Sequence, residues 1–286
     1  AWLSVTRLVA KLVLIVGLVA CGLSLTGAIV GSLGASFAEL CVSRFFIRPS
    51  LFAARAFPLR KLWVYAGPLS LTALSFSLYG KMDVLLLKSL GVTTAQVGFY
   101  GAAQNIASVP SLFPVAFSGV LLSSLSRWWR LGDLAHVQSL GRDALRAVLI
   151  LLPIAAITAG ASEEIVTFAL GAAFLPAAPF LAVLIFGAFA MMLVSVGLIL
   201  FTPSGNPRWS VLLAGPLVVV VFCAHLIVIP LFGALGAALV SCGGAILCAL
   251  TALTIIARHW RIVLPFHTCW RSLVVCSLAY GAALAW

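Results

Sequence analysis

The stretch LWVYAGPLSLTALSFSLYGKMDVLLLKSLG, from Leu62 to Gly91, is the most informative part of the sequence for the fold class. Its part from Leu62 to Leu87 exceeds the ~20 mostly apolar residues that a membrane-spanning helix needs. It also contains Lys81 and Asp83, and a charge at the centre of a spanning helix costs about 2.5–3.5 kcal/mol on insertion scales. Such residues usually face other protein or a water-filled cavity. The alternative is that both lie near one membrane surface, where the Lys81 ammonium reaches water.

The composition indicates a polytopic membrane protein with an all-α helix-bundle fold. The chain is 64% hydrophobic and 8% charged, with a mean hydropathy of +1.24, whereas soluble domains contain about 25% charged residues. A net charge of +11 would suggest nucleic acid as the partner of a soluble protein. Here the basic residues cluster at the ends of apolar segments, so the bilayer is the expected partner. The chain begins at Ala1 and ends within an apolar run, so we expect a fragment of a longer protein.

Nine apolar segments are predicted to cross the membrane. They are residues 8–30, 34–52, 62–91, 95–126, 144–161, 177–202, 209–230, 232–257 and 268 onward. Pro110 and Pro114 predict a kink in the fourth segment. A further segment, from Glu163 to Phe174, is too short and too acidic to span.

The charges of the connecting loops predict the orientation. If alternate loops share a side, 14 of the 17 Lys and Arg residues fall on one face. Lys88, Glu163 and Glu164 fall on the other face. The positive-inside rule makes the first face cytoplasmic, which supports a multi-pass membrane protein. The 14 residues are Arg7, Lys11, Arg48, Arg55, Arg60, Lys61, Arg127, Arg130, Arg142, Arg146, Arg208, Arg258, Arg261 and Arg271.

A short internal similarity suggests two related halves. GSLGAS, from Gly31 to Ser36, resembles GALGAA, from Gly233 to Ala238, which lies 202 residues further along. Each is expected at the junction between two apolar segments. Small residues recur by chance in membrane helices because they let backbones pack closely. The basic residues Arg55 and Arg258, which follow at similar distances, favour the repeat, and repeats are typical of transporters.

The chain contains no recognisable nucleophile, phosphate-binding or metal-binding motif and only six carboxylates, so neither enzymatic activity nor a cofactor or metal is predicted. His225, within an apolar segment, is interpreted as a packed, hydrogen-bonded residue rather than a proton relay. The polar residues within the apolar segments are more informative. They are Glu39 and Arg44 on the second segment, Lys81 and Asp83 on the third, and Gln104 and Asn105 on the fourth.

Helical periodicity places two polar stripes on the third segment. Residues two apart point about 200° apart on a helix, so Lys81 and Asp83 cannot pair with each other. One stripe consists of Thr72, Ser75, Tyr79 and Asp83, and the nearly opposite one of Ser70, Ser77, Lys81 and Lys88. We expect a helix that lines a cavity on one side and packs inside a bundle on the other. The alternative is one stripe for helix contacts and one for lysines that reach the membrane surface.

Several short motifs, in this order, resemble one family. They are YAGP (65–68), LYGKMDVLLL (78–87) and VGFYGAA (97–103), followed by Ile165–Gly171, Ser204–Arg208 and Ile229–Ala238. The chain, from about Arg7 to Arg258, is similar to the O-antigen and exopolysaccharide flippases of the multidrug/oligosaccharidyl-lipid/polysaccharide exporter superfamily. The resemblance implies a MATE-like fold of 12 to 14 helices in two six-helix lobes. Residues 1–56 would end an incomplete first lobe, residues 57–258 would form the second lobe, and residues 259–286 a truncated extra helix.

The resemblance implies transport of a polyprenyl-pyrophosphate-linked oligosaccharide, for O-antigen, capsule or exopolysaccharide synthesis, by alternating access. On this hypothesis Lys81 and Arg44 meet the pyrophosphate. Tyr79, Gln104 and Asn105 bind sugar hydroxyls, and Asp83 or Glu39 serves ion coupling or helix pairing.

Polysaccharide polymerase and glycosyltransferases are candidate partners of such a flippase. The alternatives are a cation-coupled multidrug exporter of the same superfamily, or a non-transporting scaffold or lipid-modifying enzyme of an envelope glycan pathway. We further expect Lys81 to face the cavity between the lobes and Asp83 to turn into its own lobe toward Gln104 or Asn105. The alternative assignment exchanges the two faces.

Overall fold

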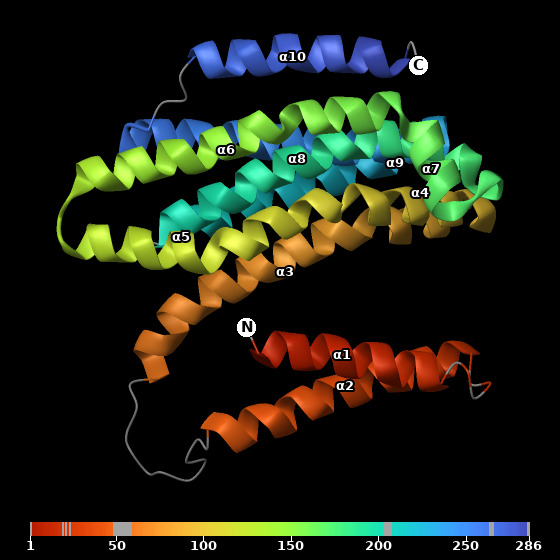
Figure 1. Cartoon of the computed structure of the whole chain (residues 1–286), viewed down its shortest axis with the longest axis horizontal. Helices are drawn as coiled ribbons and strands as arrows, with labels where there is room; N and C mark the ends of the chain where they lie inside the picture. Colours follow the sequence, from red (N-terminus) through yellow and green to blue (C-terminus); the bar gives the residue numbers. More distant parts are fainter. Residues whose placement is uncertain are drawn as a thin grey trace. The chain divides into compact units, whose positions relative to one another are not determined.

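The computed structural model describes residues 2–18, 20, 22, 24–47, 59–202, 208–262 and 266–284. The regular elements in these ranges are all helices, as Figure 1 shows, which confirms the predicted all-α membrane helix bundle. The chain divides into two compact units, Ala1–Pro58 and Leu59–Trp286.

The first unit is a pair of packed helices, α1 (Trp2–Leu18) and α2 (Ser24–Ile47). Gly22, between them, has a φ of 89°, a conformation that glycine adopts without steric cost. A Cβ placed on Gly31 would lie 3.0 Å from the Ile15 side chain, so the two backbones approach closely there. The predicted boundaries of the first two segments, 8–30 and 34–52, are therefore wrong. The connection lies near Gly22, about ten residues earlier than the apolar pattern suggested.

The predicted repeat is wrong for the same reason. Gly31–Ser36 lies inside α2, where Gly31 lets α1 approach. Gly233 instead has φ 58° and ψ −138°, outside the helical region. The two similar hexapeptides thus have different structural roles. The first allows close helix packing at Gly31, and the second allows a change of backbone direction at Gly233.

The second unit contains the remaining helices. They are α3 (Leu59–Ser89), α4 (Thr94–Ala107), η2 (Val109–Ser111), α5 (Leu112–Arg130), α6 (Leu134–Gly160), α7 (Ser162–Leu170), η3 (Ala172–Ala177), α8 (Ala178–Phe201), α9 (Arg208–Trp260) and α10 (Phe266–Leu284). The kink predicted in the fourth segment is confirmed, because the short 3₁₀ helix η2, which contains Pro110, separates α4 from α5. Proline lacks the N–H that would continue the α-helical hydrogen bonds.

Helix α9 consists of two legs that meet at Gly233, which we call the first leg (residues 208–232) and the second leg (residues 234–260). A Cβ on Gly244 of the second leg would meet the side chains of Val221 and Leu217 of the first. The legs therefore fold back on each other as a hairpin, as predicted for two separate segments. Helix α8 packs against α4, α5, α6, α7 and α9 and forms the centre of this unit.

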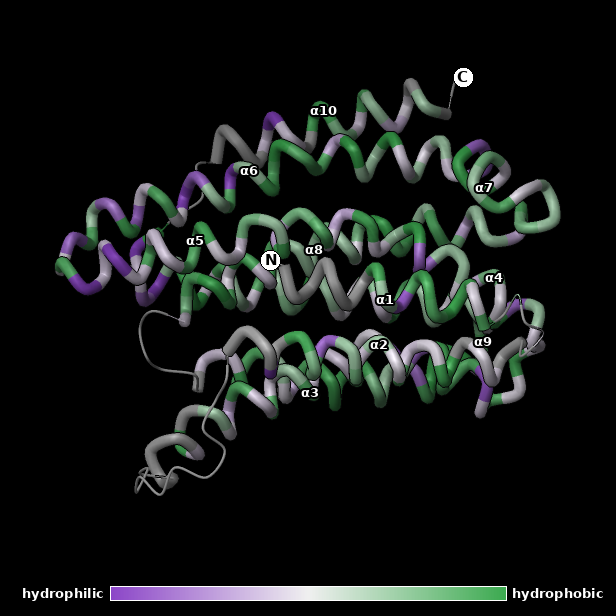
Figure 2. The backbone as a smooth tube through the Cα atoms, turned by 60° about the horizontal axis from the view of Figure 1, so that its bottom comes forward, coloured by the Kyte–Doolittle hydropathy of each residue, from purple (hydrophilic) through white to green (hydrophobic). Residues whose placement is uncertain are grey.

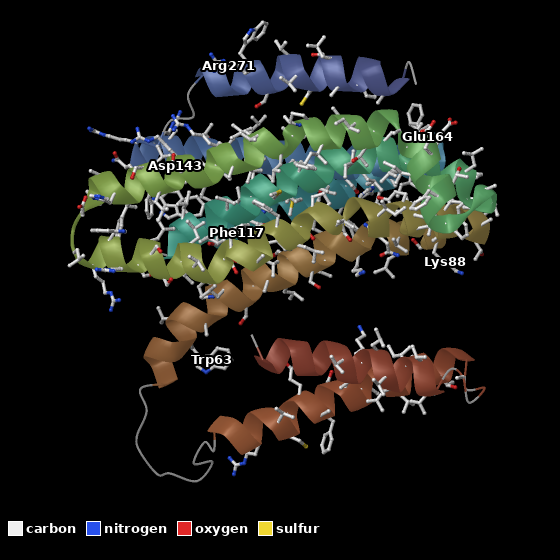
Figure 3. All side chains as sticks on the ribbon, in the orientation of Figure 1. Trp63, Lys88, Phe117, Asp143, Glu164 and Arg271 are labelled. Atoms are coloured by element: carbon white, nitrogen blue, oxygen red, sulfur yellow. The ribbon has the colours of Figure 1, made fainter. Side chains whose placement is uncertain are left out.

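Charged residues gather at the two ends of the second unit. Figure 3 places Lys88 and Glu164 at one end and Asp143 toward the other. Figure 2 shows hydrophilic residues concentrated where α5 connects to α6, the site of Arg127, Arg130, Arg142 and Arg146. This separation agrees with the loop charges predicted from the sequence. Which end is cytoplasmic stays a prediction.

Four stretches of the described residues are long and apolar enough to cross a membrane: Thr94–Arg130, Leu134–Gly160, Ala172–Phe201 and Trp209–Trp260, the last containing both legs of α9. The polar stripes of α3 dilute its hydropathy, and α3 is not among the four. The surface of the second unit carries many large apolar side chains that are half or more exposed, such as Leu71, Val120, Ile150, Ile227 and Leu250. Extended apolar surfaces of this kind mark contact with a membrane or a partner. The count of nine crossings stays a prediction.

Candidate functional site

The carboxylate of Asp83 lies at the centre of a buried polar cluster in the second unit. Its side chain is only 1% exposed. Oδ2 accepts hydrogen bonds from the Tyr100 hydroxyl at 2.6 Å and from Nε2 of Gln104 at 2.8 Å. Oδ1 accepts from the backbone N–H of Val84 at 2.8 Å. The predicted turn of Asp83 into its own unit, toward Gln104, is thereby confirmed.

The connection between α3 and α4 brings these residues together. Gly91, with φ 83°, takes the left-handed conformation that the tight turn requires, and the Thr93 side chain caps α4 by accepting from the backbone N–H of Gln96. Tyr100 and Gln104 are four residues apart, so they share one face of α4. That face meets the buried stripe of α3 at Asp83.

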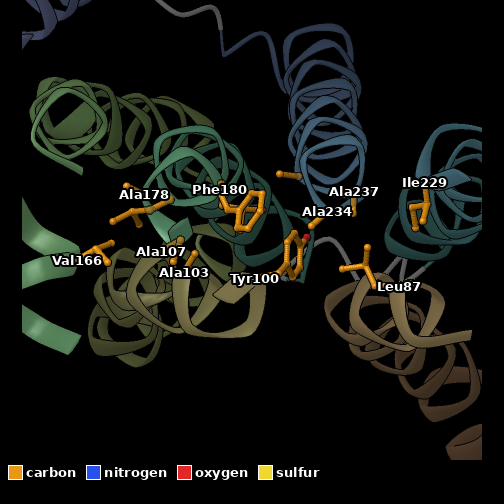
Figure 4. Close-up of a cluster of buried hydrophobic side chains, with 14 residues drawn as sticks. Leu87, Tyr100, Ala103, Ala107, Val166, Ala178, Phe180, Ile229, Ala234 and Ala237 are labelled. Atoms are coloured by element: carbon orange, nitrogen blue, oxygen red, sulfur yellow. The ribbon is translucent and has the colours of Figure 1, made fainter. Parts of the chain in front are cut away.

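Hydrophobic packing fixes the position of the Tyr100 ring. Figure 4 shows it between Phe180 of α8 and Leu87 of α3, with Ala234 of α9 close by. The ring centroids of Tyr100 and Phe180 are 6.0 Å apart, a separation typical of aromatic pairs. Tyr100 is fully buried, so its hydroxyl has no water to bond and depends on Asp83.

The second leg of α9 supplies the other side of the cluster. The Ser241 hydroxyl lies 3.5 Å from Asp83 Oδ2 and 3.4 Å from Nε2 of His225, a residue of the first leg. The Tyr79 hydroxyl donates to the backbone carbonyl of Ser241. His225 is completely buried. Its Nδ1 is the one buried side-chain nitrogen or oxygen atom among the described residues that has no hydrogen-bond partner. The cluster thus connects α3, α4 and both legs of α9.

A cavity of about 190 Å³ borders the cluster. Tyr79, Asp83, Gln104 and Ser241 are among its lining residues, together with residues of α8. Pockets that hold organic ligands usually measure about 300–1,000 Å³. This cavity is therefore smaller than a usual site for an organic ligand and has room for water or a small ion.

The two polar stripes predicted on α3 are confirmed by the burial of their residues. Thr72, Ser75 and Asp83 are buried and Tyr79 is half-buried. The opposite stripe, which consists of Ser70, Ser77, Lys81 and Lys88, is exposed on the surface of the second unit. Lys81 thus points away from the cluster that holds Asp83, as the 200° separation requires.

The other predicted site residues are Asn105 of the second unit and Glu39 and Arg44 of the first. Asn105 is exposed on α4 next to Gln104. Glu39, half-buried, and Arg44, exposed, lie on α2 of the first unit, and each makes at least one interaction. Among the described residues, no group of three or more His, Cys, Asp or Glu side chains is arranged to hold a metal ion.

Sequence reasoning missed three members of the cluster. Tyr100 could have been found, because it lies four residues before Gln104 and so on the same helix face. Ser241 and His225 lie 158 and 142 residues beyond Asp83 in the sequence, and only the folded hairpin of α9 brings them near it. His225 is hydrogen-bonded and packed, as predicted, but only at one ring nitrogen.

The fold and the polar cluster define a membrane helix-bundle protein with a buried, hydrogen-bonded carboxylate. Residues 1–179 match the family model described as polysaccharide biosynthesis protein. Because this match covers more than half of the chain, the protein belongs to that family, in agreement with the resemblance to polysaccharide flippases. No curated protein shows significant sequence similarity to the chain.

Proposed function

We propose that this protein carries a polyprenyl-pyrophosphate-linked oligosaccharide across the bacterial cytoplasmic membrane for the synthesis of a surface polysaccharide. Membership of a polysaccharide biosynthesis family supports a role in glycan synthesis, and the apolar helices support a membrane location. A glycan pyrophosphate cannot cross hydrocarbon unaided, because each unsatisfied polar group costs several kcal/mol there. A multi-pass bundle that offers polar and cationic side chains in a cleft solves this problem.

One observation carries the proposal: the two charges of α3, Lys81 and Asp83, lie on opposite faces of the helix. Asp83 accepts hydrogen bonds inside the second unit, whereas Lys81 is exposed on the surface of that unit. A lysine that only faced lipid would bring a cost and no benefit. In our proposal Lys81 binds the pyrophosphate, and Arg44 of the first unit is a second candidate cation for this role.

The remaining residues receive supporting roles. Asn105, exposed beside Gln104, is the best placed of the three predicted sugar-binding residues. Tyr79 and Gln104 already make hydrogen bonds within the second unit and line its small cavity, so they would contact the sugar only in another state of the alternating-access cycle. Asp83 pairs α3 with α4 and α9 and is the candidate for ion coupling, with Glu39 as the other.

The test compares two lysines of the same exposed stripe. In cells whose own flippase gene is deleted, Lys81→Ala should lower surface polysaccharide about tenfold or more, since hydrogen bonds to charged groups contribute about 1.5–3 kcal/mol. Lipid-linked glycan should accumulate on the inner leaflet, with protein abundance unchanged. Lys88→Ala, seven residues further along the same helix, serves as the matched control and should export normally.

Wild-type export by Lys81→Ala would contradict the assignment of that residue. If the wild-type protein failed to restore surface polysaccharide but lowered the accumulation of amphipathic cations in the cell, the multidrug exporter would replace the flippase.

A further inference from the structure

A groove with apolar walls lies between α5, α6 and α8 of the second unit and has a volume of about 280 Å³. Of the described residues that line it, all but Ser124 have apolar side chains. Phe117 (labelled in Figure 3) and Val120 line the groove and are both more than half exposed, so the groove is open at the surface of the unit. The three helices belong to stretches that are long and apolar enough to cross a membrane. The opening therefore faces the acyl chains of a bilayer.

The groove has the length of one membrane leaflet. Its lining residues on α5 extend from Phe113 to Ser124, which is about 16 Å along the helix at 1.5 Å per residue. The hydrocarbon core of a bilayer is about 30 Å thick, so one leaflet contributes about 15 Å. A single acyl chain therefore fits along the groove, with one end near the middle of the membrane and the other near its surface.

Aromatic side chains surround the end of the groove that lies toward the connection between α5 and α6. Helix α5 continues past the groove for one turn, to Arg127 and Trp128. The Trp128 ring stacks on the His136 ring of α6, with centroids 4.4 Å apart, and so joins two of the helices that form the walls. Trp129 and Trp260 stack on each other at 4.9 Å. Because tryptophan is enriched where a bilayer meets water, this end of the groove lies at the level of the lipid headgroups.

Arg127 is the cation nearest this end on the groove side of α5. It follows Ser124 by three residues and Val120 by seven, so the three side chains share one face of the helix. The guanidinium carbon of Arg127 lies 5.6 Å from the centre of the Trp128 ring, within the range of a cation–π contact. The ring thus positions the cation one helical turn beyond the apolar walls.

The positive charge of Arg127 is available to a ligand, because the acidic residues nearby have other partners. Asp133 is bonded to Nδ1 of His136 at 2.6 Å, and Asp143 lies 3.4 Å from Arg146. No carboxylate in the described ranges forms an ion pair with Arg127. An unpaired cation next to an apolar groove complements a ligand that carries a negative charge on a long apolar chain.

We propose that this groove binds an anionic phospholipid of the membrane. One acyl chain lies along the groove from Ser124 toward Phe113, and the phosphate accepts hydrogen bonds from Arg127 beside the Trp128 ring. Guanidinium groups bind phosphate through paired hydrogen bonds, and basic pockets between membrane helices bind anionic headgroups. A zwitterionic phospholipid offers the same chain and phosphate, but its ammonium group cancels the charge, so it binds more weakly.

This lipid site goes beyond the proposed function, because a membrane phospholipid binds whatever the cargo is. It shares no lining residue with the cavity beside Asp83. A chain in the groove fills the space between α5, α6 and α8 and adds contacts to all three. The bound phospholipid therefore stabilises the packing of these helices.

The experiment uses the full chain in phosphatidylcholine nanodiscs without any cargo, so its outcome is independent of the flippase proposal. A trace of phosphatidylglycerol with a photoreactive group at the end of one acyl chain is included, and phosphatidylcholine with the same chain is the parallel probe. After illumination, mass spectrometry locates the cross-linked residues. The anionic probe should label residues 113–121 about fivefold more than the zwitterionic one, the factor expected for one basic residue that binds an anionic lipid.

Variants separate the charge from the groove. Arg127→Gln should reduce labelling by the anionic probe to the zwitterionic level. Lys88→Gln removes a cation from the other end of the unit (Figure 3) and should leave the preference unchanged. Ala147→Phe fills the groove and should reduce labelling by both probes to the background level. Ala116→Phe, at an exposed position of α5 outside the groove, is its matched control and should label normally.

Thermal unfolding in detergent provides a second measurement, because a ligand that binds the folded protein raises its midpoint. Added phosphatidylglycerol should raise the midpoint of the wild-type protein and have little effect on Arg127→Gln. Phosphatidylcholine should have little effect on either.

Three results would overturn the lipid site. Equal labelling of residues 113–121 by the two probes would indicate ordinary contact with the bilayer, and no labelling there by either probe would indicate that something else covers the groove. A polyprenyl phosphate that displaces the anionic probe at a tenfold lower concentration than unlabelled phosphatidylglycerol would make an isoprenoid chain the occupant.

Discussion

Replacing Asp83 with alanine tests whether the polar cluster stabilises the second unit. The variant leaves the Tyr100 hydroxyl, which is fully buried, and Nε2 of the half-buried Gln104 without their acceptor. A buried polar group without a partner costs about 1–3 kcal/mol, so the two together cost about 2–6 kcal/mol. The variant also removes the desolvation cost of a buried carboxylate, which places the expected loss in the lower half of that range.

The assay is chemical unfolding of the purified chain in detergent micelles, together with abundance in the membrane. Asp83→Ala should unfold at a clearly lower denaturant concentration and reach lower abundance, because a loss of this size is a large share of a typical stability of about 5–15 kcal/mol. Asp83→Asn keeps an acceptor oxygen and should lose less. Lys81→Ala, two residues earlier and exposed, is the control and should change stability by about 0.5 kcal/mol or less. Equal midpoints for Asp83→Ala and Lys81→Ala would refute the reasoning.

Three further predictions concern topology, helix packing and pH. In a background without native cysteines, an impermeant thiol reagent should label a cysteine at Thr93 from outside the cell but not one at Gly132; the reverse pattern would invert the orientation. A Cβ on Gly187 would lie 3.1 Å from the Cys242 backbone, whereas one on Gly215 meets nothing within 4 Å. Gly187→Val should therefore lower the free energy of unfolding by about 1–3 kcal/mol, and Gly215→Val should lower it much less. Equal losses for the two variants would contradict close packing of α8 against α9. The backbone N–H of His136 donates to Asp133 and lowers the pKa of that carboxyl below 3.8. The stability advantage of the wild-type protein over Asp133→Asn should therefore be complete above pH 3.8 and disappear as the pH falls through the lowered pKa of the folded protein. Unfolding midpoints that differ equally at all pH values would contradict this.

Helical periodicity allowed the main features of α3 to be predicted. Two residues on a helix cannot point the same way when they are two positions apart, so the opposite directions of Lys81 and Asp83 follow from the sequence. The contact between Asp83 and Gln104 follows from the next helix returning alongside, and the break near Pro110 follows from the missing N–H of proline. These are local consequences of sequence, and the structure confirms them.

The features that could not be predicted depend on where the chain turns or on distant contacts. In the first unit an unbroken run of small and apolar residues offers glycines at positions 22 and 31, and composition does not tell a turn from a close helix contact. Because the turn was predicted at Gly31 and not near Gly22, the predicted boundaries of both helices were wrong and the two hexapeptides looked like a repeat. Ser241 and His225 entered the cluster through the α9 hairpin, whose register against α3 no local pattern specifies. The small cavity likewise arises from packing of several helices.

The most direct test of the central claim is a flipping assay with purified components. The full chain is placed in vesicles with a short polyprenyl pyrophosphate that carries a fluorescent oligosaccharide, initially confined to the inner leaflet. An impermeant reagent added outside then measures how much glycan has crossed. The account predicts that glycan becomes accessible in vesicles with the wild-type chain and stays at the protein-free level with Lys81→Ala. Glycan that stays on the inner leaflet in the presence of wild-type protein, or crosses equally with Lys81→Ala, would contradict it.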